Sequence, residues 1–174
     1  MNIKMDVLKA VAAMLFVIMA FSPLYAAQGD TEMRIAGGYS MFNMEPNDDD
    51  EEDSYSLDVL FGEYATDNVF LGVQGLGAWG DDVDLYGLGL NAQYQFAAHD
   101  ANVIPYAGGQ LNFVCVENSF DEDGWMWGPL AGVKMPVNQS TDLFVEYQYQ
   151  MFDGDADNLI DDAHAIKAGL AWKF

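Results

Sequence analysis

The chain has 174 residues, with 28 acidic residues against six Lys and Arg and a formal net charge of −22. Its length suits one domain, and a content of 51% hydrophobic and 14% aromatic residues excludes a disordered acidic tail as the main interpretation. The negative charge argues against a nucleic-acid partner, because phosphate binding needs a basic face. The single cysteine, Cys115, excludes an intramolecular disulfide framework and a zinc site built from cysteines.

Residues 1–26 have the features of a secretory signal peptide. Lys4 and Lys9 form a short positive region, an apolar run covers residues 11–21, and a small residue, Ala26, ends the segment. The apolar run is shorter than the ~20 residues that a membrane-spanning helix needs, although an N-terminal membrane anchor is the alternative. We predict that residues 1–26 are removed and that residues 27–174 form the mature domain. That domain contains 27 acidic and four basic residues, a net charge of −23.

After residue 27 the side chains alternate with a period of two, as in β-strands that have two different faces. One face is rich in Ile, Leu, Val, Met and aromatic residues, whereas the other is mainly Gly, Ala, Ser, Gln and Asn. Eight segments show this pattern, at about residues 33–41, 55–62, 69–79, 86–96, 106–115, 125–135, 143–151 and 165–174. Two features blur the pattern: Pro129 predicts a bulge in the sixth segment, and Gly75-Leu76-Gly77 obscures the third.

The connections between the segments fall into two classes. Those at 65–68, 97–102 and 137–141 are short, whereas 43–54, 116–124 and 153–162 are longer, and 80–82 is a short connection on the same side as the long ones. Nineteen of the acidic residues lie at the longer side. An even number of strands with short turns at one end and longer loops at the other is typical of outer-membrane barrels. The sequence therefore predicts an all-β fold, an eight-stranded antiparallel up-and-down transmembrane β-barrel.

Aromatic residues near the ends of the segments support a membrane barrel, because aromatic girdles mark the membrane interfaces. We place Phe42, Tyr55, Trp79, Trp125 and Trp127 in a girdle towards the loops, and Phe96, Phe144, Trp172 and Phe174 in one towards the turns. The alternative is a soluble β-sandwich or a lipocalin-like barrel. Such a fold should have a more strongly polar and charged second face than this chain has.

The last segment, Ala163-His164-Ala165-Ile166-Lys167-Ala168-Gly169-Leu170-Ala171-Trp172-Lys173-Phe174, resembles the final strand of small bacterial outer-membrane barrels, a family that includes the membrane domain of OmpA, OmpX and OmpW. The resemblance extends over the mature chain as an eight-strand pattern. It implies a location in the outer membrane of Gram-negative bacteria, with outer-membrane lipids and lipopolysaccharide as surroundings. It also implies that the barrel-assembly machinery recognises the strand that ends in Phe174.

No residue is assigned a catalytic, cofactor-binding or metal-binding role. His164 is the one position worth testing for the lipid A chemistry of related barrel enzymes, with Ser119 as the nearest serine by topology, but a surface histidine is the preferred interpretation. We interpret Cys115 as a small lipid-facing residue, and an intermolecular disulfide is the alternative. The acidic segment Asp153–Asn158 does not match a calcium-binding EF-hand. We interpret it and Glu45–Asp53 as a solvated acidic rim, and weak binding of Ca²⁺ or Mg²⁺ there is the alternative hypothesis.

The inward face contains charged residues that should be paired, since an unpaired buried charge is costly. A hairpin centred near Ser140 would place Lys134 opposite Glu146, and the next hairpin would place Glu146 opposite Lys167. Arg34 and Asp58 are expected to pair across the first hairpin. These pairs predict a closed lumen, which an eight-stranded barrel can fill with side chains.

The sequence thus favours a non-enzymatic outer-membrane barrel with acidic extracellular loops and a role in envelope structure or surface interaction. The first alternative is a narrow transport barrel for small apolar molecules, as the resemblance to OmpW would allow. The second is a lipid A-modifying enzyme.

Overall fold

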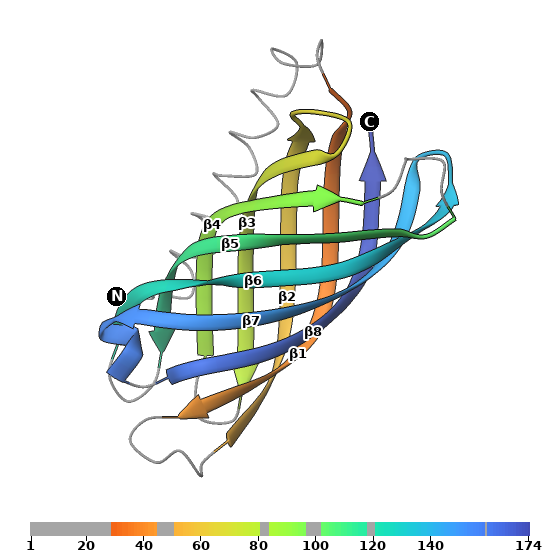
Figure 1. The fold of residues 1–174 in the computed structure, drawn as a ribbon. Coiled ribbons are helices and arrows are strands. Elements are labelled where there is room, and N and C mark those ends of the chain that lie inside the picture. The colour runs from red at the N-terminus through yellow and green to blue at the C-terminus, as the bar shows by residue number, and fades with distance from the viewer. Residues whose placement is uncertain (1–28, 45–50, 81–83, 97–101, 118–120, 159) are drawn as a thin grey trace.

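A computed structural model shows a closed antiparallel barrel of eight strands in which each strand pairs with its neighbours in sequence and β8 pairs with β1 (Figure 1). The structure describes residues 29–44, 51–80, 84–96, 102–117, 121–158 and 160–174. The predicted signal peptide therefore lies outside the described residues. The strands are β1 (Thr31–Met44), β2 (Glu51–Tyr64), β3 (Val69–Gly80), β4 (Asp84–Gln95), β5 (Ile104–Glu117), β6 (Asp121–Asn138), β7 (Thr141–Gly154) and β8 (Ile160–Lys173). This architecture confirms the predicted fold class.

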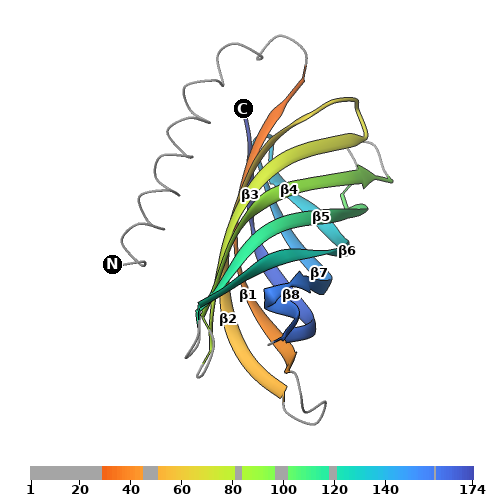
Figure 2. The same cartoon turned by 90° about the vertical axis from the view of Figure 1, so that its left-hand side faces the viewer.

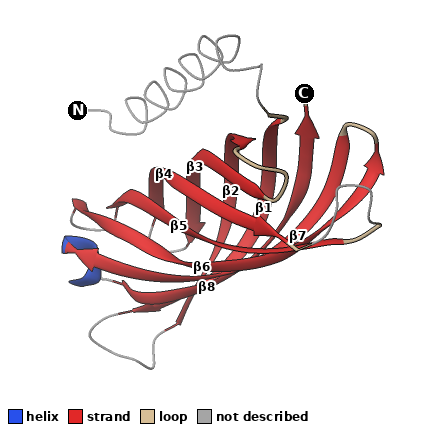
Figure 3. Cartoon of the chain, turned by 45° about the horizontal axis from the view of Figure 1, so that its top comes forward, coloured by secondary structure: helices blue, strands red, loops and turns tan. Residues whose placement is uncertain are grey.

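One short 3-10 helix, η1 (Asp155–Asn158), connects β7 to β8 and is drawn in blue in Figure 3. It lies at the end of the barrel opposite the 65–68 and 139–140 connections. We call the end with these connections the turn end, and the end with η1 the loop end. Within the described ranges, no helix has the length and apolar character needed to cross a membrane.

The strands are longer than the alternation alone predicted. Most contain 14 residues, and β6 contains 18. At about 3.4 Å per residue, 14 residues extend about 48 Å, which exceeds what a tilted strand needs to cross the membrane. At the loop end the strands continue through acidic residues such as Asp53, Asp123 and Asp153. These carboxylates were predicted to lie in loops, but they lie on paired strands. The strands arc strongly along their length, as the turned view in Figure 2 shows.

The two predicted irregularities are not found where they were expected. β6 keeps one register with β7 from Trp127 to Pro136, so the bulge predicted at Pro129 is wrong. The register shifts instead between Pro136 and Asn138, next to the turn. In β3 the pairing with β2 and β4 runs through residues 75–77 without a shift, so the strand parity is regular there.

The predicted division into two faces is confirmed. Inward residues such as Gln74, Asn112 and Lys167 are buried, whereas outward residues such as Leu90 and Ile166 are exposed. The outward aromatic residues form contacting pairs near the loop end: Tyr39 with Tyr55, Trp79 with Tyr86, and Phe113 with Trp125. Tyr94 and Phe96 form such a pair near the turn end.

Two residues assigned to these girdles are placed differently by the structure. Phe42 and Phe144 are 1% and 3% exposed and lie in the lumen. Their position follows from strand parity, since each is adjacent to outward residues on its strand. The expectation that they face the membrane interface is therefore wrong.

Candidate functional site

The lumen of the barrel is the candidate site, because it collects the buried charged and polar side chains. At its turn end one carboxylate, Glu32, holds two cations. The Lys134 ammonium donates to both of its oxygens, at 2.7 and 2.9 Å, and the Arg34 Nε donates to Oε1 at 2.5 Å. The Tyr64 hydroxyl donates to Glu32 Oε2 at 2.9 Å. All four residues are buried, and charge-assisted bonds of this kind are among the stronger hydrogen bonds in proteins.

Aromatic rings surround the cationic part of this cluster. The Arg34 guanidinium carbon lies 4.6 Å from the centre of the Phe70 ring, 5.5 Å from that of Tyr106 and 5.7 Å from that of Phe144. Cation–π contacts at these distances compensate a desolvated cation in part. They explain how Arg34 remains buried although Nη1 and Nη2 have no hydrogen-bond partner in the structure.

Amide side chains fill the middle of the lumen. Gln74 Nε2 donates to Gln110 Oε1 at 2.8 Å and to Asn112 Oδ1 at 2.7 Å. Gln110 in turn donates to Gln148 at 3.0 Å, and Gln148 donates to Glu146 at 2.6 Å. This network crosses the barrel from β3 to β7, so each amide satisfies another polar group that is removed from water.

Several of these hydrogen bonds join strands that are not neighbours. They pass over a glycine that faces inward on the strand between them. Tyr106 on β5 and Glu146 on β7 both face Gly132 on β6, and the Tyr106 hydroxyl donates to Glu146 at 2.9 Å. A Cβ atom at Gly132 would lie 2.6 Å from that hydroxyl. Gln74 and Asn112 likewise face Gly89 from either side. A side chain at either glycine would occupy the path of the hydrogen bond.

A diagonal contact of a related kind forms the second buried ion pair. Lys167 on β8 faces Gly38 on β1, and its ammonium reaches Asp58 on β2, which faces Ala36, at 2.7 Å. A Cβ atom at Gly38 would lie 2.7 Å from Lys167 Cγ. A third pair, Lys173 with Asp142 at 2.8 Å, lies at the turn end. The absence of a side chain at Gly38 thus permits an ion pair between strands that are not neighbours.

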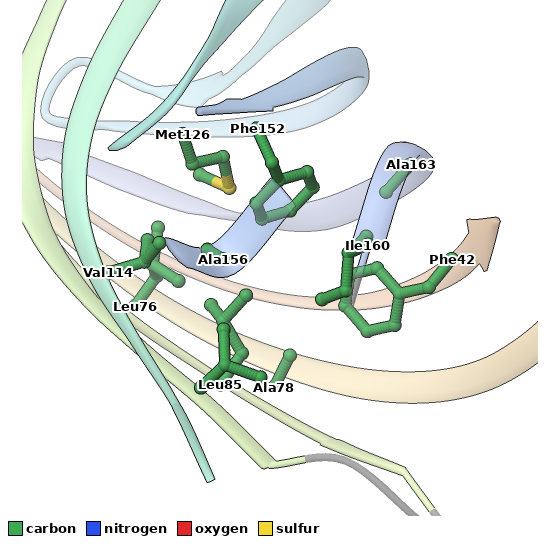
Figure 4. Packing of buried hydrophobic residues seen from close by; sticks show 11 residues of the cluster. Phe42, Leu76, Ala78, Leu85, Val114, Met126, Phe152, Ala156, Ile160 and Ala163 are labelled. Carbon is green, nitrogen blue, oxygen red and sulfur yellow. The ribbon is translucent and has the colours of Figure 1, made fainter. Parts of the chain in front are cut away.

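The loop end of the lumen is apolar instead of ionic. Eleven buried residues form one cluster there, and Figure 4 shows that their side chains come from strands on several sides of the barrel and from η1. The Phe42 and Phe152 rings meet edge to face, with centres 6.4 Å apart. Ala156 of η1 and Ile160 at the start of β8 are fully buried in this cluster. The connection between β7 and β8 therefore covers the apolar end of the lumen.

Between the two ends lies a cavity of about 20 Å³. Its lining includes Arg34, Asp58, Asn91 and Glu146. This volume has room for about one water molecule. Asp58 Oδ2 and Asn91 Oδ1 have no protein partner, and buried polar atoms of this kind are commonly satisfied by internal water.

The charges of the buried ionic side chains and their salt-bridge partners balance. Four basic side chains, those of Arg34, Lys134, Lys167 and Lys173, are matched by four acidic ones, those of Glu32, Asp58, Asp142 and Glu146. These four are also all the Lys and Arg residues that follow residue 26. The net charge of −23 of residues 27–174 therefore comes entirely from residues outside this group.

Two of the three predicted ion-pair alignments are wrong. Lys134 faces Phe144, and Glu146 faces Gly132, because the shift near Asn138 moves the β6–β7 register by two from the expected centre. Arg34 faces Leu60 and bonds to Glu32, not to Asp58. Glu146 does face Lys167, as predicted, but its hydrogen bonds come from neutral donors such as Tyr106, and Lys167 pairs with Asp58.

Glu32 is the central residue that the sequence prediction missed. It lies at inward parity, two residues before Arg34, but the first strand was expected to begin only at Met33. The signal that could have identified it is the continued alternation through Glu32, together with the excess of basic over acidic residues in the predicted inward pairs.

His164 lies on the outward face near the loop end. Its Nδ1 is 2.6 Å from the Tyr147 hydroxyl, and its ring stacks on Tyr147 and lies tilted against Tyr149. Asp162 accepts hydrogen bonds from Tyr149, at 2.7 Å, and from Asn43. The imidazole thus belongs to an aromatic and polar surface cluster, whereas Ser119 lies outside the described residues.

The remaining candidates contribute no organised site in the described parts of the chain. Cys115 is half-buried on the outward side of β5, opposite Tyr86. Of the acidic segments, 45–50, 81–83 and 118–120 lie outside the described residues. Where the structure describes the chain, no group of three or more His, Cys, Asp or Glu side chains is arranged to hold a metal ion.

Comparison with known proteins gives the same architecture. Neisserial surface protein A is similar with a TM-score of 0.72 at 20% identity, over 83% of this chain and 97% of that one. The N-terminal barrel of Pseudomonas aeruginosa OprF follows with 0.60 at 19% identity, over 84% and 100%. Ail of Yersinia pestis, in complex with the heparin analogue sucrose octasulfate, has 0.55 at 12% identity, over 84% and 99%. These identities show a shared fold.

A search of curated proteins found no significant match. The outer membrane protein beta-barrel domain matches residues 10–174, nearly the whole chain. Together with the closed eight-stranded barrel and its outward aromatic pairs, this match places the protein in the outer membrane. The chain belongs to the outer membrane protein beta-barrel family.

Proposed function

We propose that the protein is a non-enzymatic barrel with a closed lumen that contributes to envelope structure or surface interaction. The observation that carries this proposal is the placement of all four basic residues of the mature domain in the lumen, each paired with or close to a carboxylate. A pore for ions would need these charges to face water. Here the basic side chains bond to carboxylates inside the barrel instead.

The proposed surface partners follow from the charge that remains outside. With no Lys or Arg left for phosphate, contact with lipopolysaccharide would depend on divalent cations shared between its phosphates and the acidic loop end. Ail was solved with a polyanion, but the charge of this chain does not favour such a ligand. We propose that the loop end faces the cell exterior, since longer connections do so in this class of barrel. The C-terminal strand β8, together with Phe174 that follows it, would be recognised by the assembly machinery.

The apolar loop end of the lumen favours one alternative, a transport barrel for small apolar molecules. Phe42, Phe152 and Met126 would form the walls of such a path. The path would then meet the buried Glu32–Arg34–Lys134 cluster. An apolar molecule there would break strong ionic hydrogen bonds and could form none in their place. The lipid A-modifying alternative would require a serine near His164, whose Nδ1 already bonds to Tyr147.

Planar-bilayer conductance of the folded protein tests the closed lumen. We expect no steady conductance, with or without Mg²⁺, in preparations whose gel mobility shows the folded barrel. A steady conductance that scales with salt concentration would contradict the proposal. Selective passage of an apolar fluorescent probe into vesicles that contain the barrel, without ion conductance, would favour the transport alternative.

A further inference from the structure

The outward face of β3–β6 contains an apolar groove of about 720 Å³. This volume falls within the range of about 300–1,000 Å³ that is typical of small-molecule sites. The groove follows a row of residues that face one another across four strands: Leu71, Ala92, Gly109 and Pro129. The row spans about 14 Å, since neighbouring strands are about 4.8 Å apart.

The shape of the groove results from the sizes of these side chains. Ala92 and Gly109 form a low floor, between Leu71 at one end of the row and Pro129 at the other. Leu90, Leu111 and Trp127, from the next row towards the loop end, form a taller side wall. A small pair flanked by large apolar side chains produces a depression in a surface that is otherwise convex around the barrel.

The groove lies between the aromatic residues of the two membrane interfaces. The Phe113–Trp125 pair lies on the same strands nearer the loop end, and the Tyr94–Phe96 pair lies nearer the turn end. The depth between two aromatic girdles is the hydrocarbon region of the membrane. No charged side chain lines the groove, so an occupant at this depth must be apolar.

A second copy of this chain does not suit the groove. Association about a two-fold axis brings the same patch of both copies together. Two concave floors, each made by Ala92 and Gly109, would then face each other and leave a void. A flexible hydrocarbon chain, in contrast, can fill a narrow depression along its length, and dispersion contacts accumulate with each methylene that is in contact.

We propose that this groove binds one acyl chain of an outer-membrane lipid. Strands of such barrels tilt by about 35–45° from the membrane normal, so a row perpendicular to them crosses the hydrocarbon region obliquely. The acyl chain lies in the row between Leu71 and Pro129 with Trp127 along its side. The proposal rests on the location of the barrel in the outer membrane and is independent of whether the lumen conducts.

The glycine in the floor provides a sharp test. A Cβ atom at Gly109 would make only an ordinary contact, 3.6 Å from the Gly128 carbonyl oxygen, so Gly109→Leu fills the groove without disturbing the sheet. Gly37→Leu is the matched control: Gly37 is also outward, a Cβ there would lie 3.9 Å from the nearest atom, and it lies on β1, away from the groove. Ala92→Leu fills the same floor from the neighbouring strand and serves if Gly109→Leu does not fold.

Folded, delipidated barrel would be titrated with dimyristoyl phosphatidylethanolamine or dimyristoyl phosphatidylcholine and examined by native mass spectrometry. We expect wild type and Gly37→Leu to retain one lipid with either headgroup, and the two groove-filling variants to retain at least tenfold less. Equal retention by the groove-filling variants and wild type would overturn the proposal. So would a tenfold dependence on the headgroup, or a dimer of the wild type that Gly109→Leu dissociates.

Discussion

Replacement of Glu32 by Gln tests whether the turn-end cluster stabilises the barrel through charge pairing. The change keeps the shape of the side chain but removes the negative charge that Lys134 contacts at 2.7 and 2.9 Å and Arg34 at 2.5 Å. Two fully buried cations would remain without their counter-charge. Breaking a buried ion pair by removal of one partner typically costs about 3–5 kcal/mol, which is a large part of the stability of an ordinary domain. We expect the free energy of unfolding to fall by about that amount.

Glu146→Gln is the matched control, because it changes the charge of the lumen equally. The hydrogen-bond donors to Glu146 are neutral: Tyr106, Gln93 and Gln148. We expect a smaller loss of about 1–2 kcal/mol, the difference between charged and neutral hydrogen bonds. Both variants can be measured by denaturant unfolding in lipid vesicles, with tryptophan emission and gel mobility as independent signals.

A second substitution sharpens the comparison. Lys134→Met should destabilise the wild-type barrel, because it removes a partner of Glu32, but it should stabilise Glu32→Gln, because it removes an unpaired cation. Equal losses for Glu32→Gln and Glu146→Gln would refute the reasoning, since only total charge would then matter. The same effect of Lys134→Met in both backgrounds would refute it independently.

Three other outcomes are expected. Gly132→Ala should lower the free energy of unfolding by about 1–3 kcal/mol, because its Cβ would overlap the Tyr106 hydroxyl. Gly37→Ala, where the space is open, should change the free energy of unfolding little. Equal losses in the two variants would exclude the steric explanation. Leu90→Arg should cost about 2–4 kcal/mol in vesicles if Leu90 lies near the membrane midplane, and a loss under about 1 kcal/mol would place it at an interface. Calorimetry of the folded barrel should show binding heat for Ca²⁺ or Mg²⁺ beyond that of monovalent salt at the same ionic strength; its absence would remove divalent cations as partners.

The sequence was sufficient to predict the fold because strand parity is a local property. The alternation of outward Leu88 and Leu90 with inward Gly89 and Asn91 does not depend on the register of the neighbouring strand. Phe42 and Phe144 were assigned wrongly when their distance from the strand end was given more weight than their parity. Both side chains are in the lumen, as the alternation alone required.

The ion pairs were less predictable because they depend on the register between strands and on how far a long side chain extends across the lumen. A single irregularity between Pro136 and Asn138 displaces Lys134 from Glu146. The pair of Lys167 with Asp58 joins strands that are not neighbours and depends on Gly38 between them. Pairing rules for adjacent strands do not include such contacts, but an inward glycine on the strand between two polar residues is a sequence signal for them.

The enclosure of every Lys and Arg of residues 27–174 has a consequence for proteolysis. Trypsin-like enzymes cut after these residues, and all four lie on paired strands of a closed sheet with their side chains directed into the lumen. The connections at the loop end contain many acidic residues but no Lys or Arg. The folded barrel should therefore resist trypsin at the surface of intact cells, whereas a protease that cuts at Asp or Glu finds many sites in its sequence. An environment rich in trypsin-like enzymes would leave this protein intact as long as it stays folded.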